Sequence, residues 1–199
     1  MATPATTPLT RDESPAGETA VGQVVADAQL AATRGAADGG AQIAFMNPGG
    51  LRANLTAGAD GAVRYEDLFS VQPFYNNLVT MTLSGEQLVQ LLEQQWRNQP
   101  AARLMQVSRG FSYTWDAARP VGQRVVVESV RLNGQAISAD SQLRVTVNAF
   151  MASGGDNFNV LRSGSDQRTG MMDVDAFELY IKNNPGLLPG KLDRIARLN

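Results

Sequence analysis

Alternating apolar and polar residues predict several β-strands in this chain. Residues 143–148 alternate between apolar Leu or Val and polar Arg, Thr or Asn, a pattern of period two that is typical of a half-buried strand. Segments with the same alternation or a short apolar run predict three further strands, at residues 42–46, 79–83 and 111–115. The aromatic residues at 111, 113 and 115 share one face, and we interpret them as core rather than as a carbohydrate platform.

Apolar residues at helical spacing predict three helices. Val21, Val24, Val25 and Ala28 share one face of a helix that ends near Gly35. Within it, Gly22 costs about 1 kcal/mol relative to Ala, which indicates close packing or backbone approach.

The second helix has the strongest start signal. Ser84 and Gln87 form a capping box ahead of a buried stripe. That stripe comprises Leu88, Leu91, Leu92 and Trp96. The third helix begins with Asp173 as its cap and ends at Pro185–Gly186.

The order of these elements indicates the fold class. Asn133–Gly134 between two apolar segments, 124–132 and 135–137, predicts a β-hairpin. Strands and helices in mixed order, with hairpins, favour an α+β fold over a doubly wound parallel sheet. We expect residues 11–199 to form one domain. Residues 1–10, rich in Thr, Pro and Ala and lacking the apolar core of a signal peptide, are expected to be an extended lead-in, as in a piece of a longer protein.

Composition excludes several functional classes. The 199 residues contain no His, so neither a His-based general base nor a His-ligated metal is available. The absence of Cys excludes disulfides and thiolate chemistry. With a net charge of −2 and no basic run, no nucleic acid polymer is expected as a partner. No apolar segment approaches the roughly 20 residues of a membrane span.

Candidate binding residues follow two of the predicted strands. Phe150, then Gly154–Gly155 and Asp156, come after the strand at 143–148 and place an aromatic face beside an acceptor, which suits a ring attached to a sugar. From spacing alone, a core Phe and a tight turn are the simpler interpretation. Asn47 to Arg52 follows the strand at 42–46 and suits an anion or sugar, or is an ordinary turn with a surface Arg.

An ordered set of motifs spans most of the chain. It comprises Glu13-Ser-Pro, Val21-Gly-Gln-Val-Val-Ala-Asp-Ala28, Asn47-Pro-Gly-Gly-Leu-Arg52, Val71-Gln-Pro-Phe74, Leu83-Ser-Gly-Glu-Gln-Leu88 and Asn148-Ala-Phe-Met-Ala-Ser-Gly-Gly-Asp-Asn-Phe158. From about Arg11 to about Lys182 this set resembles the C-terminal domain of the 5′-nucleotidase family, of the bacterial 5′-nucleotidase and UDP-sugar hydrolase type. The resemblance implies a layered α-β-β-α sandwich with mixed sheets that supplies the nucleotide-binding pocket.

The resemblance also implies roles for particular residues. Phe74 and Phe150 match the two aromatics that the family places on either face of the nucleobase, and Asp156 matches its acceptor for the ribose hydroxyls. Arg52 matches an arginine at the ribose and phosphate. The remaining matches are Arg11, a second arginine; Asn47 and Gly50, polar and backbone contacts; and Ser108, a backbone contact below the base.

Two departures from the family pattern concern the pocket. Pro48 replaces the first of three glycines and removes one N–H that a ligand could contact. Tyr75 and Asn76 stand where smaller residues are frequent, so the rim of the base pocket is expected to differ.

The function implied by the resemblance is divided between two domains. This chain would hold the nucleoside end, while an N-terminal metallophosphoesterase domain outside it would supply two divalent metal ions, so the chain alone is expected to be inactive. Two alternatives stay open: a nucleotide- or nucleoside-binding module without a catalytic partner, and a scaffold domain that no longer binds. The resemblance implies a periplasmic or cell-surface location.

Overall fold

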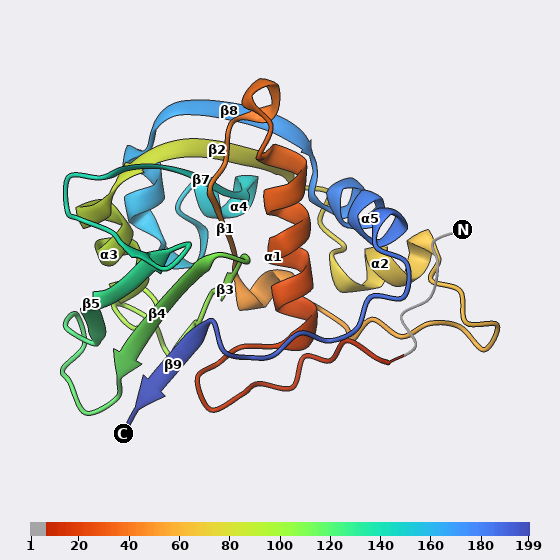
Figure 1. The fold of residues 1–199 in the computed structure, drawn as a ribbon, viewed down its shortest axis with the longest axis horizontal. Coiled ribbons are helices and arrows are strands. Elements are labelled where there is room, and N and C mark those ends of the chain that lie inside the picture. Colours follow the sequence, from red (N-terminus) through yellow and green to blue (C-terminus); the bar gives the residue numbers. More distant parts are fainter. Residues whose placement is uncertain (1–6) are drawn as a thin grey trace.

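The computed structural model describes residues 7–199, arranged as two mixed β-sheets and five α-helices within that range (Figure 1). The helices are α1 (Ala20–Thr33), α2 (Tyr65–Val71), α3 (Gly85–Glu93), α4 (Ala149–Ala152) and α5 (Asp173–Asn183). The strands are β1 (Ile43–Met46), β2 (Asn77–Ser84), β3 (Gln106–Val107), β4 (Phe111–Asp116), β5 (Val125–Leu132), β6 (Gln135–Ala136), β7 (Gln142–Asn148), β8 (Ser165–Met172) and β9 (Ile195–Leu198). The 3₁₀ helices are η1 (Ala36–Asp38), η2 (Pro48–Gly50), η3 (Gly155–Asn157) and η4 (Asn159–Ser163).

The first sheet has five strands in the order β3-β1-β7-β2-β8. Strands β1 and β7 are parallel, whereas β2 is antiparallel to both β7 and β8. In the register of β2 on β7, Val79 lies opposite Val147 and Met81 opposite Val145, so apolar residues share one face. That face belongs to a core cluster with α3 and the second sheet. The predicted period-two alternation is therefore what places this sheet on its core.

The opposite face of the first sheet packs under α1. Here the buried hydroxyl of Thr146 lies 2.8 Å from that of Thr33 and 2.7 Å from that of Thr80, so the polar residues of the alternation satisfy one another across the sheet and helix. In Figure 1, α1 crosses this face while α2 and α5 lie beside it. A second core cluster joins α1, α2 and α5.

The second sheet has the order β6-β5-β4-β9 and contains the predicted hairpin. Asn133 and Gly134 have φ values of 52° and 79°, which is the left-handed turn that an Asn-Gly pair favours. Strand β9 pairs in parallel with β4. Both sheets are mixed, which confirms the expected α+β architecture.

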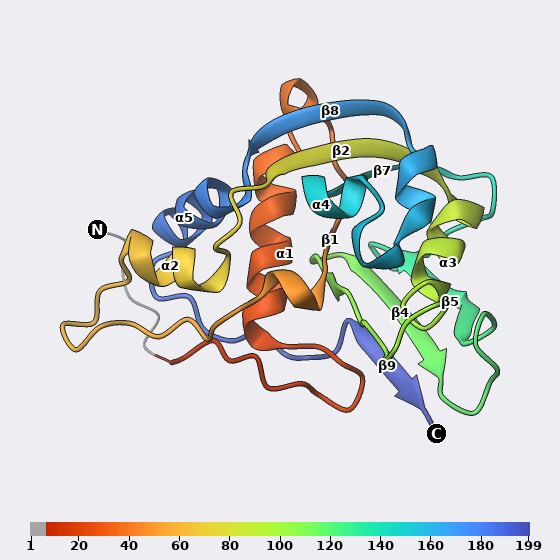
Figure 2. The same cartoon turned by 180° about the vertical axis from the view of Figure 1, so that it is seen from behind.

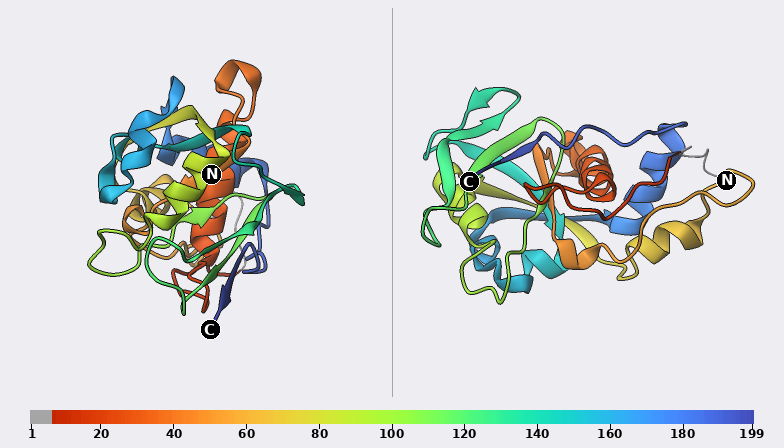
Figure 3. Two further views of the ribbon diagram at one scale, coloured as in Figure 1. Left: turned by 90° about the vertical axis from the view of Figure 1, so that its left-hand side faces the viewer. Right: turned by 90° about the horizontal axis from the view of Figure 1, so that it is seen from below.

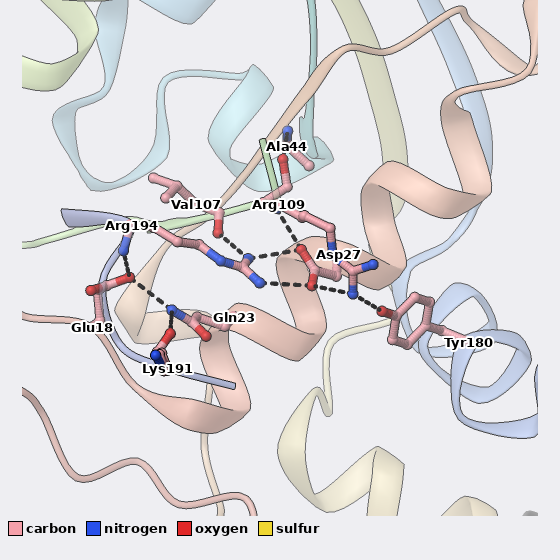
Figure 4. Close-up of polar contacts among 10 residues, drawn as sticks. Glu18, Gln23, Asp27, Ala44, Val107, Arg109, Tyr180, Lys191 and Arg194 are labelled. Carbon is pink, nitrogen blue, oxygen red and sulfur yellow. Dashed lines mark hydrogen bonds and ion pairs between the residues drawn. The ribbon is translucent and has the colours of Figure 1, made fainter. Parts of the chain in front are cut away.

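A buried ion pair attaches the segment before β9 to α1. Arg194 donates two hydrogen bonds, of 2.8 and 2.9 Å, to the carboxylate of Asp27 on α1 (Figure 4). Arg109 donates its backbone N–H to the same carboxylate at 2.6 Å, and Glu18 accepts from the backbone of Arg194 at 3.1 Å. Burial raises the pKa of Glu18, against the lowering effect of its hydrogen bonds. The same C-terminal segment passes alongside α1 in Figure 3.

Most predicted elements are confirmed, including the capping box of α3. The N–H of Gln87 donates to Ser84 Oγ at 3.1 Å, and the Ser84 N–H donates to the Gln87 side chain at 2.7 Å. Gly22 packs so closely on the side chain of Gln106 that a Cβ there would collide with it.

Three expectations need correction. Met172, not Asp173, is the N-cap of α5, and Asp173 is its first helical residue. Strands β3, β8 and β9 were not predicted: β3 has only two residues, and β8 is an almost wholly exposed edge strand without alternation. Within the expected lead-in, residues 1–6 lie outside the described part of the chain. Leu9, in contrast, is fully buried and bridges to Leu55, so this position is packed rather than a free linker.

Candidate functional site

One pocket lies where the ends of three adjacent strands meet. Asn47 directly follows β1, Asn148 ends β7, and Asn76 directly precedes β2. Because β1 and β7 are parallel and β2 is antiparallel to β7, these three positions fall at the same edge of the sheet, and Leu78 pairs with Asn148. Helix α4, directly after β7, lies at this edge (Figure 2).

The pocket has a volume of about 310 Å³. It is lined by Asn47, Gly49, Gly50, Arg52, Phe74, Asn76, Arg103, Asn148, Phe150 and Asp156. Six of the eight residues expected to bind substrate are therefore brought together from segments far apart in the sequence. The other two, Arg11 and Ser108, are not among the lining residues.

Asp156 is held in place by two donors. Its Oδ2 accepts from Asn47 Nδ2 at 2.7 Å, and its Oδ1 accepts from Arg103 at 2.9 Å. Asn148 donates to Asn47 Oδ1 at 3.0 Å, and this contact fixes the Asn47 amide with its NH₂ group toward Asp156. Only 13% of the Asp156 side chain is exposed, so this carboxylate is a fixed acceptor at the pocket wall.

Phe74 and Phe150 are exposed rings rather than core residues. Their exposed fractions are 49% and 46%, so the interpretation of Phe150 as core is wrong. A Cβ at Gly155 would collide with the Phe150 ring, which explains the need for glycine beside it. The preceding Gly154 has a φ of 83°, the left-handed conformation that lets the chain turn back on the ring.

Arg52 lies between η2 and the Phe74 ring. Its guanidinium is 5.9 Å from the ring centroid and donates to the Gly49 carbonyl at 3.3 Å. Arg11 contacts the segment that contains Arg52. Its guanidinium donates to the Arg52 carbonyl at 3.4 Å, and its backbone N–H donates to the Asn54 side chain at 2.8 Å. Arg11 thus supports the segment that carries Arg52.

Gly50 and Ser108 have their polar groups engaged within the protein. The N–H of Gly50 donates to the Asn47 carbonyl at 3.1 Å in a turn that begins with Pro48. Ser108 is fully buried, where its Oγ accepts from the Ala44 N–H at 2.9 Å and its own N–H donates to the Ala44 carbonyl at 3.0 Å. Its described contacts join β1 to the start of the second sheet.

Sequence patterns missed one charged pocket residue, Arg103. It lies in the irregular segment between α3 and β3, where no periodicity or motif marks it. Asn148 and Asn76 were noticed only as part of a motif and as a rim residue. A polar residue at the end of a strand was the available signal for Asn148.

The pocket combines apolar faces with an excess of positive charge. Arg52 and Arg103 face the single carboxylate of Asp156, which leaves a formal charge of +1 among the lining residues.

Below the rim, Asp173 accepts from Asn76 Nδ2 at 3.5 Å and donates its N–H to the Asn76 carbonyl at 2.8 Å. Burial raises the pKa of Asp173 to about 6, although hydrogen bonds from Val174 and Asn76 oppose the shift.

Two searches of the described residues concern other kinds of site. Residues 7–199 hold no group of three or more His, Cys, Asp or Glu side chains arranged to bind a metal ion. Over the same range, no helix has both the length and the apolar character needed to span a membrane.

Fold and pocket together define a mixed α/β domain whose pocket combines two half-exposed aromatic rings, one carboxylate and two arginines. The sequence model for the 5′-nucleotidase, C-terminal domain, matches residues 1–163, and the chain belongs to this family.

Similar proteins support the assignment. A 5′-nucleotidase precursor from Thermus thermophilus superimposes with a TM-score of 0.84 at 33% identity, covering 100% of this chain and 39% of that one. The trifunctional nucleotide phosphoesterase YfkN of Bacillus subtilis is 33% identical over 171 residues, which is 83% of this chain and 11% of YfkN. Protein UshA of Salmonella pullorum is 25% identical over 85% of this chain and 28% of its own length. The chain thus spans well under half the length of these relatives.

Proposed function

We propose that the pocket binds the nucleoside part of a nucleotide, with the base between Phe74 and Phe150. The observation that carries this proposal is the pair of half-exposed rings lining one pocket with a fixed carboxylate. A Phe that is only half buried forgoes part of the hydrophobic stabilisation available in a core. Here that apolar area faces a cavity of ligand size, where a base can cover it.

Each group of the pocket has a role in this proposal. Stacking on an aromatic ring contributes about 1–3 kcal/mol per base and tolerates different bases. Each oxygen of Asp156 accepts one hydrogen bond from the protein and keeps capacity for another, so the ribose hydroxyls can donate to it. Arg52 supplies charge for the phosphate side.

We further propose that hydrolysis of the phosphate ester needs a second domain. Members of the family named above are nucleotidases and phosphoesterases, and the chain matches a minor part of their length. The described residues do not fit a metal centre, so the two divalent ions expected from the resemblance would be held by the N-terminal metallophosphoesterase domain. In this arrangement the chain binds and orients the nucleoside end, and hinge motion between domains would bring the phosphate to the metals.

We propose a location outside the cytoplasm, in the periplasm or at the cell surface. One relative, 28% identical over 171 residues, is the cell wall protein Lmo0130 of Listeria monocytogenes.

Calorimetric titration of the chain with adenosine, AMP and UMP tests the proposed binding. We expect all three to bind, and the two nucleotides more tightly than adenosine, because Arg52 adds a charge-assisted contact to the phosphate. The expected result also includes no release of phosphate from AMP by the purified chain. Absence of binding at millimolar ligand would contradict the proposed pocket, and phosphate release by the chain alone would contradict the division between domains.

A further inference from the structure

The segment between α3 and β3 clamps the loop that carries Asp156. Three contacts cross between them: Gln99 donates to the Asp156 carbonyl at 2.6 Å, Asn157 donates to the Asn98 carbonyl at 2.9 Å, and Arg103 donates to Asp156 Oδ1 at 2.9 Å. The clamp therefore holds both the backbone and the carboxylate of the same residue.

The clamped loop has an unfavourable backbone conformation. Asp156 and Asn157 have φ values of 55° and 63°, in the left-handed region, which few non-glycine residues adopt and which Asp and Asn tolerate best among them. Such conformations cost on the order of 1 kcal/mol each and persist where surrounding contacts determine them. The clamp supplies those contacts, so the direction of the Asp156 side chain depends on it.

Arg103 also complements Asp156 in charge. The carboxylate is largely withdrawn from water, whereas 35% of the Arg103 side chain is exposed. A largely buried carboxylate is costly without a charged or hydrogen-bonding partner. Arg103 reaches the carboxylate through one hydrogen bond, from Nη1 to Oδ1, while Asn47 holds Oδ2, so the two donors together set the plane of the carboxylate.

We infer that Arg103 is a positioning residue for sugar recognition, which orients Asp156 so that the pocket selects nucleosides with 2′- and 3′-hydroxyls over those without them. This inference rests on the proposed nucleoside site. Arg103 acts through Asp156, and the substrate class that it favours is ribonucleosides and ribonucleotides. The rings of Phe74 and Phe150 contact the base and are indifferent to the sugar hydroxyls.

The test compares adenosine with 2′,3′-dideoxyadenosine in calorimetric titrations of four proteins. These are the unaltered chain, Arg103→Gln, Arg103→Lys, and Arg97→Gln as a matched control. Arg97 is an exposed arginine of the same segment and does not line the pocket. Thermal melts of all four establish that each is folded.

The unaltered chain is expected to prefer adenosine at least about tenfold, because hydrogen bonds to a charged group are lost with the dideoxy sugar. In Arg103→Gln, adenosine affinity is expected to fall about tenfold while dideoxyadenosine affinity changes less than about twofold. Arg103→Lys should recover part of the preference, and Arg97→Gln should keep all of it.

Each other outcome overturns the inference in a distinct way. Equal loss for both nucleosides in Arg103→Gln would mean that Arg103 supports the pocket as a whole. An unchanged preference in that variant would mean that Asp156 is oriented without Arg103. If the unaltered chain binds both nucleosides equally, the pocket still binds the base, but it does not recognise the sugar hydroxyls, and the inference is wrong. If it binds neither, the proposed function fails as well.

Discussion

Two sets of aromatic residues in this molecule have opposite environments. Phe111, Tyr113 and Trp115 of β4 are buried between the sheets, and the Phe111 ring lies 5.3 Å from that of Phe45 in an edge-to-face contact. Phe74 and Phe150 remain about half exposed at the pocket. The first set lies on one face of a regular strand, whereas the second lies beyond strand ends, where no sheet face covers it. Residue type alone therefore does not separate a ring that stabilises the fold from one available to a ligand.

The largest effect is expected from Phe111→Ala. Truncation of a buried Phe typically lowers the free energy of unfolding by about 3–5 kcal/mol, through lost burial and a residual cavity. Chemical denaturation of the chain measures this change. A loss below about 1 kcal/mol would mean that β4 does not anchor the core as its burial indicates.

A pH-dependent effect between pH 4 and 7 is expected at Asp173, which contacts the pocket residue Asn76. Since the pKa of Asp173 is raised to about 6 from an ordinary 3.8, the folded state favours the neutral carboxyl. The neutral Asp173 carboxyl therefore stabilises the folded state fully below about pH 4, and this stabilisation is lost as the pH rises through about 6. Asp173→Asn should therefore gain stability relative to the unaltered chain between pH 4 and 7, on the order of 2 kcal/mol. Denaturation curves at both pH values test this, and a constant difference would refute it.

Phe150→Ala is expected to affect binding more than stability. Loss of one stacking face should weaken adenosine binding by about 1–3 kcal/mol, which is roughly 5- to 150-fold. The free energy of unfolding should change by less than for Phe111→Ala, because the ring is 46% exposed. Titration and denaturation of the same preparation separate the two effects. Unchanged affinity would remove Phe150 from the proposed site.

The smallest effect is expected from Ser84→Ala, which serves as a stability control remote from the pocket. Loss of the N-cap hydrogen bond to Gln87 should cost about 1 kcal/mol of unfolding free energy. Adenosine affinity should stay unchanged, since α3 keeps its buried face. Weaker binding in this variant would show that modest destabilisation alone disturbs the pocket, and would undermine conclusions drawn from Phe150→Ala.

Sequence patterns predicted the elements that depend on local chemistry. The capping box at Ser84 and the turn at Asn133–Gly134 are determined by residues one to three positions apart, so they can be recognised without knowledge of the fold. Strand β8 has no comparable signal, because an exposed edge strand lacks a buried face to impose alternation. Within the candidate site, the family resemblance assigned roles to six of the lining residues, although these binding roles remain proposals.

The sequence by itself determined the periodicity, the turns and the ordered motifs that identify the family. Only the tertiary structure decided which ring is buried and which is exposed, and which charges meet at the pocket. Asn47 and Asp156 are 109 residues apart, and Arg103 and Asp156 are 53 apart, yet each pair is in hydrogen-bond contact. The physical reason is that these contacts arise where strands from distant segments end at one sheet edge, a meeting that no local pattern of residues encodes.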